Sequence, residues 1–102
     1  MKRVKLTDFE KQVYFVVSRI PLGEVRSYKW VAAKIGRPRA YRAVGNALHK
    51  NPFAPIIPCH RVIKSDGSIG GFARGKAAKN RLIKREREII RFIKGAKSTS
   101  KG

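Results

Sequence analysis

The segment at residues 51–62, N-P-F-A-P-I-I-P-C-H-R-V, restricts the possible folds of this chain more than any other. Its prolines recur at every third position, at Pro52, Pro55 and Pro58. Each proline fixes its own φ, removes a backbone donor and steers the preceding residue away from the helical region. We therefore expect an extended, stiff connector that is not a central strand of a sheet. The connector ends at Cys59, the only cysteine in the chain, so we expect the fold to position one thiol.

A lone cysteine limits the chemistry. It excludes an intramolecular disulfide and a thiol-rich zinc site, since only His49 and His60 could add soft ligands. We expect no metal and no cofactor. The simplest interpretation of a single cysteine is an inert, buried thiol, so a functional interpretation depends on the residues around Cys59.

The charge of the chain indicates the class of partner. Its 25 lysines and arginines against 6 acidic residues give a net charge of +19. Such an imbalance creates a long-range positive potential that attracts polyanions. Because 42% of the residues are hydrophobic, the chain can form a folded core, which favours a nucleic-acid-binding domain over a disordered basic protein or a membrane-surface protein.

The length supports one domain, which we expect at residues 1–95, followed by a mobile basic tail at residues 96–102. The first five residues are basic, but no apolar run follows them, and no window is long enough to span a membrane. We expect a soluble, cytoplasmic monomer, associated with the nucleoid if the source is prokaryotic.

Residues 7–10, T-D-F-E, form a capping box, and an amphipathic helix should follow until Pro21 stops it. Its apolar positions are Phe9, Val13, Val16, Val17 and Ile20. Ser27 should cap a second helix over residues 28–35, with an inner face formed by Trp30, Val31 and Ile35, and Gly36 should end it.

Pro38 suits a first helical position, so we expect a third helix over residues 39–50. Two short helices joined by a tight turn are typical of the helix-turn-helix, whose second helix enters a DNA groove. This helix carries small residues and cations, namely Ala40, Ala43, Gly45 and Ala47 with Arg39, Arg42 and Lys50. Small residues also permit close packing in a core, but the charge imbalance favours a binding face.

The dipeptide Asp66-Gly67 predicts a short hairpin or wing, and the glycine-rich residues 70–75 predict a loop that can cover a ligand. A last helix should span residues 76–93, with an apolar stripe formed by Leu82, Ile83, Ile89, Ile90 and Ile93. Glu86 lies on the same face. A carboxylate on a buried stripe needs a partner, which is either a structural cation or His60.

These elements predict a mainly α fold: a helix-turn-helix, winged-helix-like DNA-binding domain with a short hairpin or wing and a long C-terminal helix. If Glu86 holds one ring nitrogen of His60, the other can take the proton of Cys59 directly or through a water. A nucleophile that acts on a base in a duplex requires the base to be extruded. Arg42 and Tyr28 are the candidates for filling the space that it leaves.

One motif goes further. Pro58-Cys59-His60-Arg61-Val62 follows residues 42–48 (R-A-V-G-N-A-L) and Asn51-Pro52, and it precedes Gly70-Gly71-Phe72. Over residues 9–86 the chain resembles the carboxyl-terminal domain of the O6-alkylguanine-DNA alkyltransferases, the methylated-DNA–protein-cysteine methyltransferases. The resemblance implies irreversible transfer of an alkyl group, such as methyl, from O6 of guanine in double-stranded DNA to Cys59, with O4 of thymine as a second candidate position. The protein would be consumed in one turnover.

The resemblance also implies roles for individual residues. Cys59 would accept the alkyl group, with His60 as water-linked base, Glu86 as its orienter and Asn51 as a hinge bonding the active-site turn. The DNA-contacting set would be Arg42, Tyr28, Arg39, Ala43, Gly45, Lys50 and Arg61, with the recognition helix in the minor groove. The base pocket would be formed by Tyr28, Val62, Phe72, Ala73 and Arg74.

Two departures from the family pattern bear on these expectations. Family members commonly carry an amino-terminal domain, which we expect this chain to lack. Arg74 stands where the family usually has glycine, which affects the size of adduct admitted and adds a possible phosphate contact.

The alternative function is a non-catalytic lesion-binding or helix-turn-helix regulatory protein, but relatives that only bind lesions replace the cysteine. A thiol hydrolase would need an oxyanion hole and would leave the charge unexplained.

Overall fold

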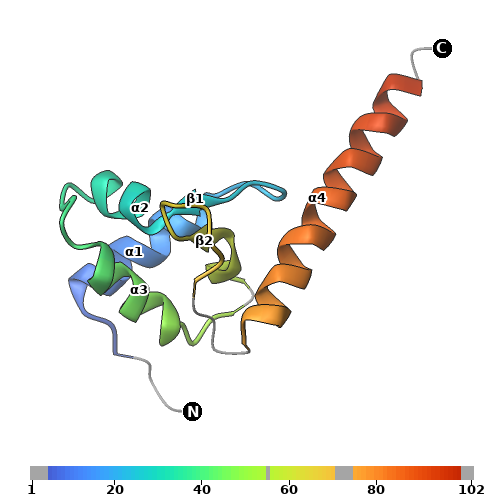
Figure 1. Cartoon of the computed structure of the whole chain (residues 1–102). Helices are drawn as coiled ribbons and strands as arrows, with labels where there is room; N and C mark the ends of the chain where they lie inside the picture. Colours follow the sequence, from blue (N-terminus) through green and yellow to red (C-terminus); the bar gives the residue numbers. More distant parts are fainter. Residues whose placement is uncertain (1–4, 55, 71–74, 100–102) are drawn as a thin grey trace.

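A computed structural model of the chain describes residues 5–54, 56–70 and 75–99, and it is mainly helical, as the sequence predicts. Within these residues the chain forms four α-helices, a 3-10 helix and a two-stranded sheet. In chain order they are α1 (Asp8–Ser18), β1 (Arg26–Ser27), α2 (Tyr28–Lys34), α3 (Tyr41–His49), η1 (Cys59–Arg61), β2 (Val62–Ile63) and α4 (Lys76–Thr99). Helices α1 to α3 gather around the sheet, while α4 runs along one side and projects away from them (Figure 1).

Helix α1 begins at the predicted capping box. The side chain of Thr7 accepts from the backbone N–H of Glu10 at 3.1 Å, and Glu10 accepts from the N–H of Thr7 at 2.9 Å. The helix ends at Ser18, ahead of Pro21. Its inner face is part of the core, which consists of Val13, Tyr14, Val17, Ile20, Val31, Ala32, Val44, Ala47, Leu48, Cys59 and Val62.

Helices α2 and α3 form the predicted helix-turn-helix. The hydroxyl of Ser27 accepts from the N–H of Trp30 at 2.9 Å, so α2 starts at the predicted residue. The expected start of α3 at residue 39 is wrong, because Pro38 lies in a β-turn and not in the first helical turn. The N–H of Ala40 donates to the carbonyl of Arg37 at 2.9 Å, which closes a turn with proline at its second position, where its fixed φ is favourable.

The two strands of the sheet do not form the predicted hairpin, because they are far apart in the sequence and run in the same direction. β1 and β2 pair in parallel, with Arg26 opposite Val62 and Ser27 opposite Ile63. The Asp66-Gly67 turn does form, since the N–H of Gly67 donates to the carbonyl of Lys64 at 2.9 Å. The strand before this turn therefore ties the Cys59 segment to the start of α2, and the wing is a closed turn beside the sheet.

Helix α4 departs from its predicted apolar stripe. Ile83 is buried, and Ile90 packs against the glycine at position 23, but Ile89 and Ile93 are 40% and 51% exposed. The reason is that the second half of the helix leaves the rest of the fold (Figure 1). The helix also continues to Thr99, beyond the expected end at residue 93. The mobility of residues 96–102 stays a prediction.

None of the helices in the described part of the chain is long and apolar enough to cross a membrane.

Candidate functional site

The connector before Cys59 is a turn and not the expected extended segment. The side-chain amide of Asn51 donates to the carbonyl of Ile57 at 2.8 Å, and its side-chain oxygen accepts from the N–H of Phe53 at 2.9 Å. The N–H of Ile57 also donates to the carbonyl of Phe53, at 3.1 Å. Proline fixes φ but leaves ψ open to turns, and one amide side chain supplies the bonds that close this one. Asn51 thus has the contacts that a hinge of the Cys59 turn needs.

Cys59 and His60 begin η1, directly after this turn. The N–H of Cys59 donates to the carbonyl of Ile57 at 2.8 Å, and the N–H of Arg61 donates to that of Pro58 at 2.9 Å. Cys59 is 8% exposed and His60 is 3% exposed. Successive side chains of a 3-10 helix lie about 120° apart, so the thiol and the imidazole point in different directions. Adjacency in sequence therefore does not bring the two groups together.

The predicted pairing of His60 with Glu86 is present. Nε2 of His60 lies 2.7 Å from Oε2 of Glu86, which reaches η1 from α4. Arg61 joins the same carboxylate through two bonds, Nε to Oε1 at 2.8 Å and Nη2 to Oε2 at 2.9 Å. Its third nitrogen, Nη1, donates to the carbonyl of Ile20 at 2.8 Å. We therefore correct the expectation that Arg61 contacts DNA, because its guanidinium is turned inward to hold Glu86.

This arrangement keeps Glu86 ionised. Burial alone raises the pKa of its carboxyl group, but the hydrogen bonds and charges of Arg61 and His60 outweigh that effect. The pKa of Glu86 consequently lies below its ordinary value of 4.5. A carboxylate that stays charged accepts the Nε2 proton of His60 and fixes the tautomer of the ring, which leaves Nδ1 as the nitrogen that can act as a base.

We expect Glu86→Gln to lower the free energy of unfolding by about 3 kcal/mol at neutral pH, because His60 and Arg61 lose their shared carboxylate in a mostly buried site. The folded-state pKa of Glu86 is depressed, so its stabilisation is present above pH 4.5 and is lost as the pH falls through the lower folded value. Urea unfolding of both proteins at neutral and acidic pH measures the difference, which should shrink in acid.

Glu88→Gln is the matched control, since Glu88 is an exposed carboxylate on the same helix. It should change the free energy of unfolding by no more than about 0.5 kcal/mol. A loss in Glu86→Gln that is the same at every pH would show that the charge of Glu86 is not what stabilises the fold.

The side chain of Tyr28 lies between α3 and the loop that follows β2. A Cβ added at Gly45 of α3 would lie 3.9 Å from the ring of Tyr28, and one added at Gly70 would lie 3.0 Å from its hydroxyl oxygen. Gly70 also has a φ of +77°, a conformation that favours glycine. Val62, directly after η1, is fully buried. Of the residues predicted for the base pocket, the structure describes Tyr28 and Val62, and their role in binding a base stays a prediction. Phe72, Ala73 and Arg74 lie outside the described residues.

The outer face of α3 carries part of the predicted DNA-contacting set. Arg42 and Ala43 are exposed, and Arg39 is exposed in the turn before the helix. Lys50, at the end of the helix, is mostly exposed and lies 3.2 Å from Glu10.

The prediction that Ala47 belongs to the small residues of the binding face is wrong. It is 2% exposed, and its carbonyl accepts from the hydroxyl of Tyr14 at 2.6 Å, so it fastens α3 to α1.

Lys79, which is fully buried at the start of α4, was not predicted as a site residue. Its Nζ donates to the hydroxyl of Tyr28 at 3.1 Å. Burial lowers the pKa of Lys79 to about 8, although the charge of Cys59 acts in the opposite direction. Its position four residues before Ile83 and seven before Glu86 places it on the inner face of the helix, which was a usable signal.

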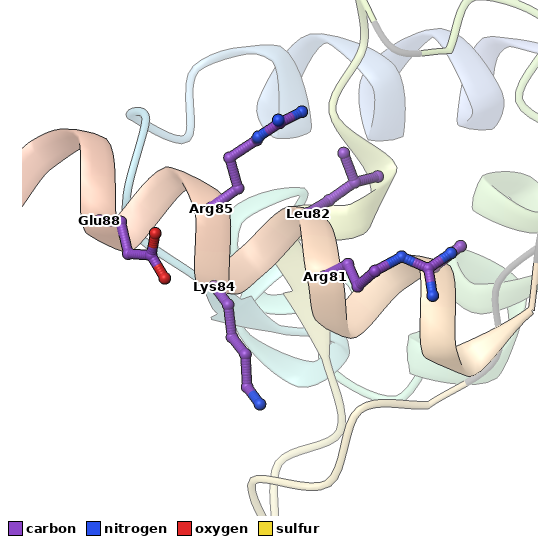
Figure 2. A pocket seen from close by; sticks show the side chains of 6 residues that line it. Arg81, Leu82, Lys84, Arg85 and Glu88 are labelled. Carbon is purple, nitrogen blue, oxygen red and sulfur yellow. The ribbon is translucent and has the colours of Figure 1, made fainter.

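A hollow lies along the exposed side of α4, and it is not part of this site. Its lining residues are Ala78, Arg81, Leu82, Lys84, Arg85 and Glu88, all from one helix, and their side chains spread apart around it (Figure 2). Among the described residues, no group of three or more histidines, cysteines and carboxylates is arranged to hold a metal ion.

A helix-turn-helix with an arginine on its outer face, beside a buried cysteine and a His–Glu pair, defines a DNA-binding domain with a thiol site. Residues 8–88 match the family model described as the DNA binding domain of 6-O-methylguanine DNA methyltransferase. The chain belongs to this family.

Two solved structures and one curated sequence illustrate the similarity. The chain is 54% identical over 85 residues to a methylated-DNA–protein-cysteine methyltransferase of Methanosarcina barkeri, covering 83% of this chain and 54% of that protein. It superposes on OGT of Mycobacterium tuberculosis in complex with DNA with a TM-score of 0.81 and 43% identity, covering 84% of this chain and 53% of the other. With Atl1 of S. pombe, in complex with damaged DNA containing O6-carboxymethylguanine, the TM-score is 0.70 and the identity 32%, covering 81% and 79%.

The chain thus spans about half the length of the curated methyltransferases that it matches.

Proposed function

We propose that this protein repairs DNA by transferring an alkyl group from O6 of guanine, and as a second substrate from O4 of thymine, to the sulfur of its own Cys59. The observation that carries the proposal is the buried Cys59 next to the His60–Glu86 pair in a member of this DNA-binding family. The protein would act as a monomer on double-stranded DNA, without cofactor, in the cytoplasm or wherever the cell holds its DNA.

The proton path follows from the ring of His60. Because Glu86 accepts the proton on Nε2, the free nitrogen Nδ1 takes the thiol proton through an intervening water. The thiolate attacks the alkyl carbon, the bond from that carbon to O6 breaks, and its electron pair stays on the base. The thioether has no route back to a thiol in this site, so each molecule reacts once.

The DNA would be held by α3, which enters the minor groove with Arg42 on its exposed face. The target base leaves the stack, Arg42 fills the space, and Tyr28 guides the rotation of the nucleotide into the pocket above Cys59. Arg39 and Lys50, at the two ends of the helix, suit phosphates. Gly45 lets the ring of Tyr28 lie close to α3. Phe72, Ala73 and Arg74 would complete the pocket.

Intact-protein mass spectrometry tests the transfer. After incubation with an excess of duplex containing O6-methylguanine, we expect every molecule to gain one methyl group on Cys59 and none to gain a second. The matched duplex with unmodified guanine should leave the mass unchanged. A protein that remains unmodified after long incubation, although it binds the duplex, contradicts the proposal.

The likeness to Atl1, of which this chain covers 79%, favours a second candidate function. In this alternative the protein binds an alkylated base without removing the alkyl group. The same experiment separates the two functions, because a lesion-binding protein would retain higher affinity for the modified duplex while its mass stayed constant.

A further inference from the structure

Helix α4 carries a stripe of residues that the proposed reaction does not use. Ala78, Leu82, Arg85, Ile89 and Phe92 follow one another in alternate steps of four and three residues, which is the spacing of the a and d positions of a coiled coil. Leu82 and Arg85 point to the same side of the helix, where both line the hollow described above (Figure 2). We call these five residues the α4 seam.

The second half of the α4 seam is exposed. Phe92 is 76% exposed and Ile89 is 40% exposed, and Ile93, which is next to them on the helix surface, is 51% exposed. They lie on the half of α4 that projects from the rest of the fold (Figure 1), and they follow residue 88, where the match to the family model ends. Large apolar side chains that gather on one exposed face indicate a surface that another molecule covers.

The charges of the α4 seam indicate the chemistry of that molecule. Arg85 lies within the seam, and Arg81 and Lys84 line the same hollow, whereas Glu88 is the one carboxylate among the lining residues. When another molecule covers the seam, the guanidinium of Arg85 loses water, which is costly unless a carboxylate is placed opposite it. The covering surface must therefore be both apolar and acidic.

We propose that the α4 seam docks an acidic amphipathic helix of a partner protein. The partner helix packs apolar residues against Leu82, Ile89 and Phe92, and it pairs a carboxylate with Arg85. Because the seam lies on α4, the exposed face of α3 stays free for DNA. This inference goes beyond the proposed alkyl transfer and does not depend on it.

Two other occupants fit the α4 seam less well. A second copy of the chain also has a net charge of +19, so the two copies would repel each other. A helix that lies on a membrane surface needs a wide apolar face, whereas this stripe has the narrow spacing of a coiled-coil seam and is interrupted by Arg85. An acidic helix satisfies both the apolar residues and the cations.

Fluorescence anisotropy of a labelled synthetic peptide, measured with the full chain, tests the proposal. The peptide has about three heptads, with leucine at a and d, glutamate at e and g, and one further glutamate in place of a seam leucine. We expect a micromolar Kd, and we expect Phe92→Ser to weaken binding by about 10-fold or more. Phe15→Ser is the matched control, because Phe15 is 63% exposed but lies on α1, and it should change the affinity by less than about 2-fold.

A second peptide, with leucine in place of the seam glutamate, tests the pairing of Arg85. Arg85→Leu should weaken binding of the first peptide by about 10-fold and should strengthen binding of the second. An equal loss of affinity for both peptides would show that only general charge attraction is at work, and it would overturn the proposal. Peptide binding that is absent, or that is unchanged in Phe92→Ser, would also overturn it.

Two further results would assign the α4 seam to another occupant and contradict the proposal. One is a dimer of the parent protein in sedimentation equilibrium that Phe92→Ser dissociates. The other is binding to phosphatidylglycerol vesicles that Phe92→Ser abolishes. Circular dichroism verifies that Phe92→Ser remains folded, which we expect because the side chain is mostly exposed.

Discussion

Replacing Cys59 with alanine is expected to abolish alkyl transfer completely. The proposed reaction ends with the alkyl group on a sulfur, and this chain has a single cysteine. The substitution removes one buried atom of a residue that is 8% exposed, so the fold should be retained with a loss of about 1 kcal/mol. Intact mass after incubation with O6-methylguanine duplex measures the outcome, and circular dichroism verifies the fold.

Cys59→Ala should lose alkyl transfer but still bind DNA. Because α3 and its exposed Arg42 lie outside the substitution, the affinity of Cys59→Ala for the duplex should stay within about 3-fold of the parent, which corresponds to less than 1 kcal/mol. Cys59→Ser is the second control, since it keeps the size of the side chain but lacks a nucleophile as acidic as a thiol. Methyl uptake by Cys59→Ala would place the acceptor on another residue and end the proposal.

The second large effect is the dependence of DNA binding on salt. The net charge of +19 and the exposed cations of α3 indicate that the complex is held mainly by phosphate contacts. If 6 to 10 phosphates are contacted, the affinity should fall by about 10³ to 10⁵ between roughly 50 and 200 mM salt, because bound counterions are released on complex formation. Fluorescence anisotropy of a labelled duplex, with Cys59→Ala as the protein, measures the affinity without the reaction.

Single charge removals locate the contacting surface. Arg39→Gln, in the turn before α3, should reduce the slope of log affinity against log salt by about one. Lys94→Gln provides the comparison, since it removes an exposed cation from the projecting half of α4. It should leave the slope nearly unchanged. Two results would exclude the α3 face as the main DNA contact. One is an affinity of Cys59→Ala that does not change with salt, and the other is a larger change of slope in Lys94→Gln than in Arg39→Gln.

Local patterns in the sequence were enough to locate much of this site. The capping box at Thr7 and the Ser27 cap each depend on a few neighbouring residues, and both elements begin where they were predicted. The contact of Glu86 with His60 was one of two predicted alternatives, because a carboxylate on the inner face of a helix needs a partner, either a structural cation or His60. The structure has both, since Arg61 binds the same carboxylate.

The residues that the sequence patterns did not predict correctly form specific contacts that those patterns do not show. The proline spacing of the connector indicated extended backbone, but the two bonds made by the Asn51 side chain favour a turn. Arg61 was predicted to contact DNA because it is a cation in a basic chain. In the fold it donates instead to Glu86 and to the carbonyl of Ile20, which are far from it in the sequence. The helical position of Lys79 indicates the inner face of α4. Its burial was nevertheless not predicted, because lysine side chains are rarely buried.

The partners of the Cys59 segment come at opposite times during synthesis. Its strand β2 pairs with residues that precede it in the chain, while Glu86 follows His60 by 26 positions. A nascent chain emerges from its amino terminus, so α1 to α3 can fold before the residue that orients the imidazole has left the ribosome. In the proposed reaction, the thiol of an unfinished chain would therefore lack the residue that orients its base. A protein that reacts once, as we propose, would then not use its only acceptor before its synthesis is complete.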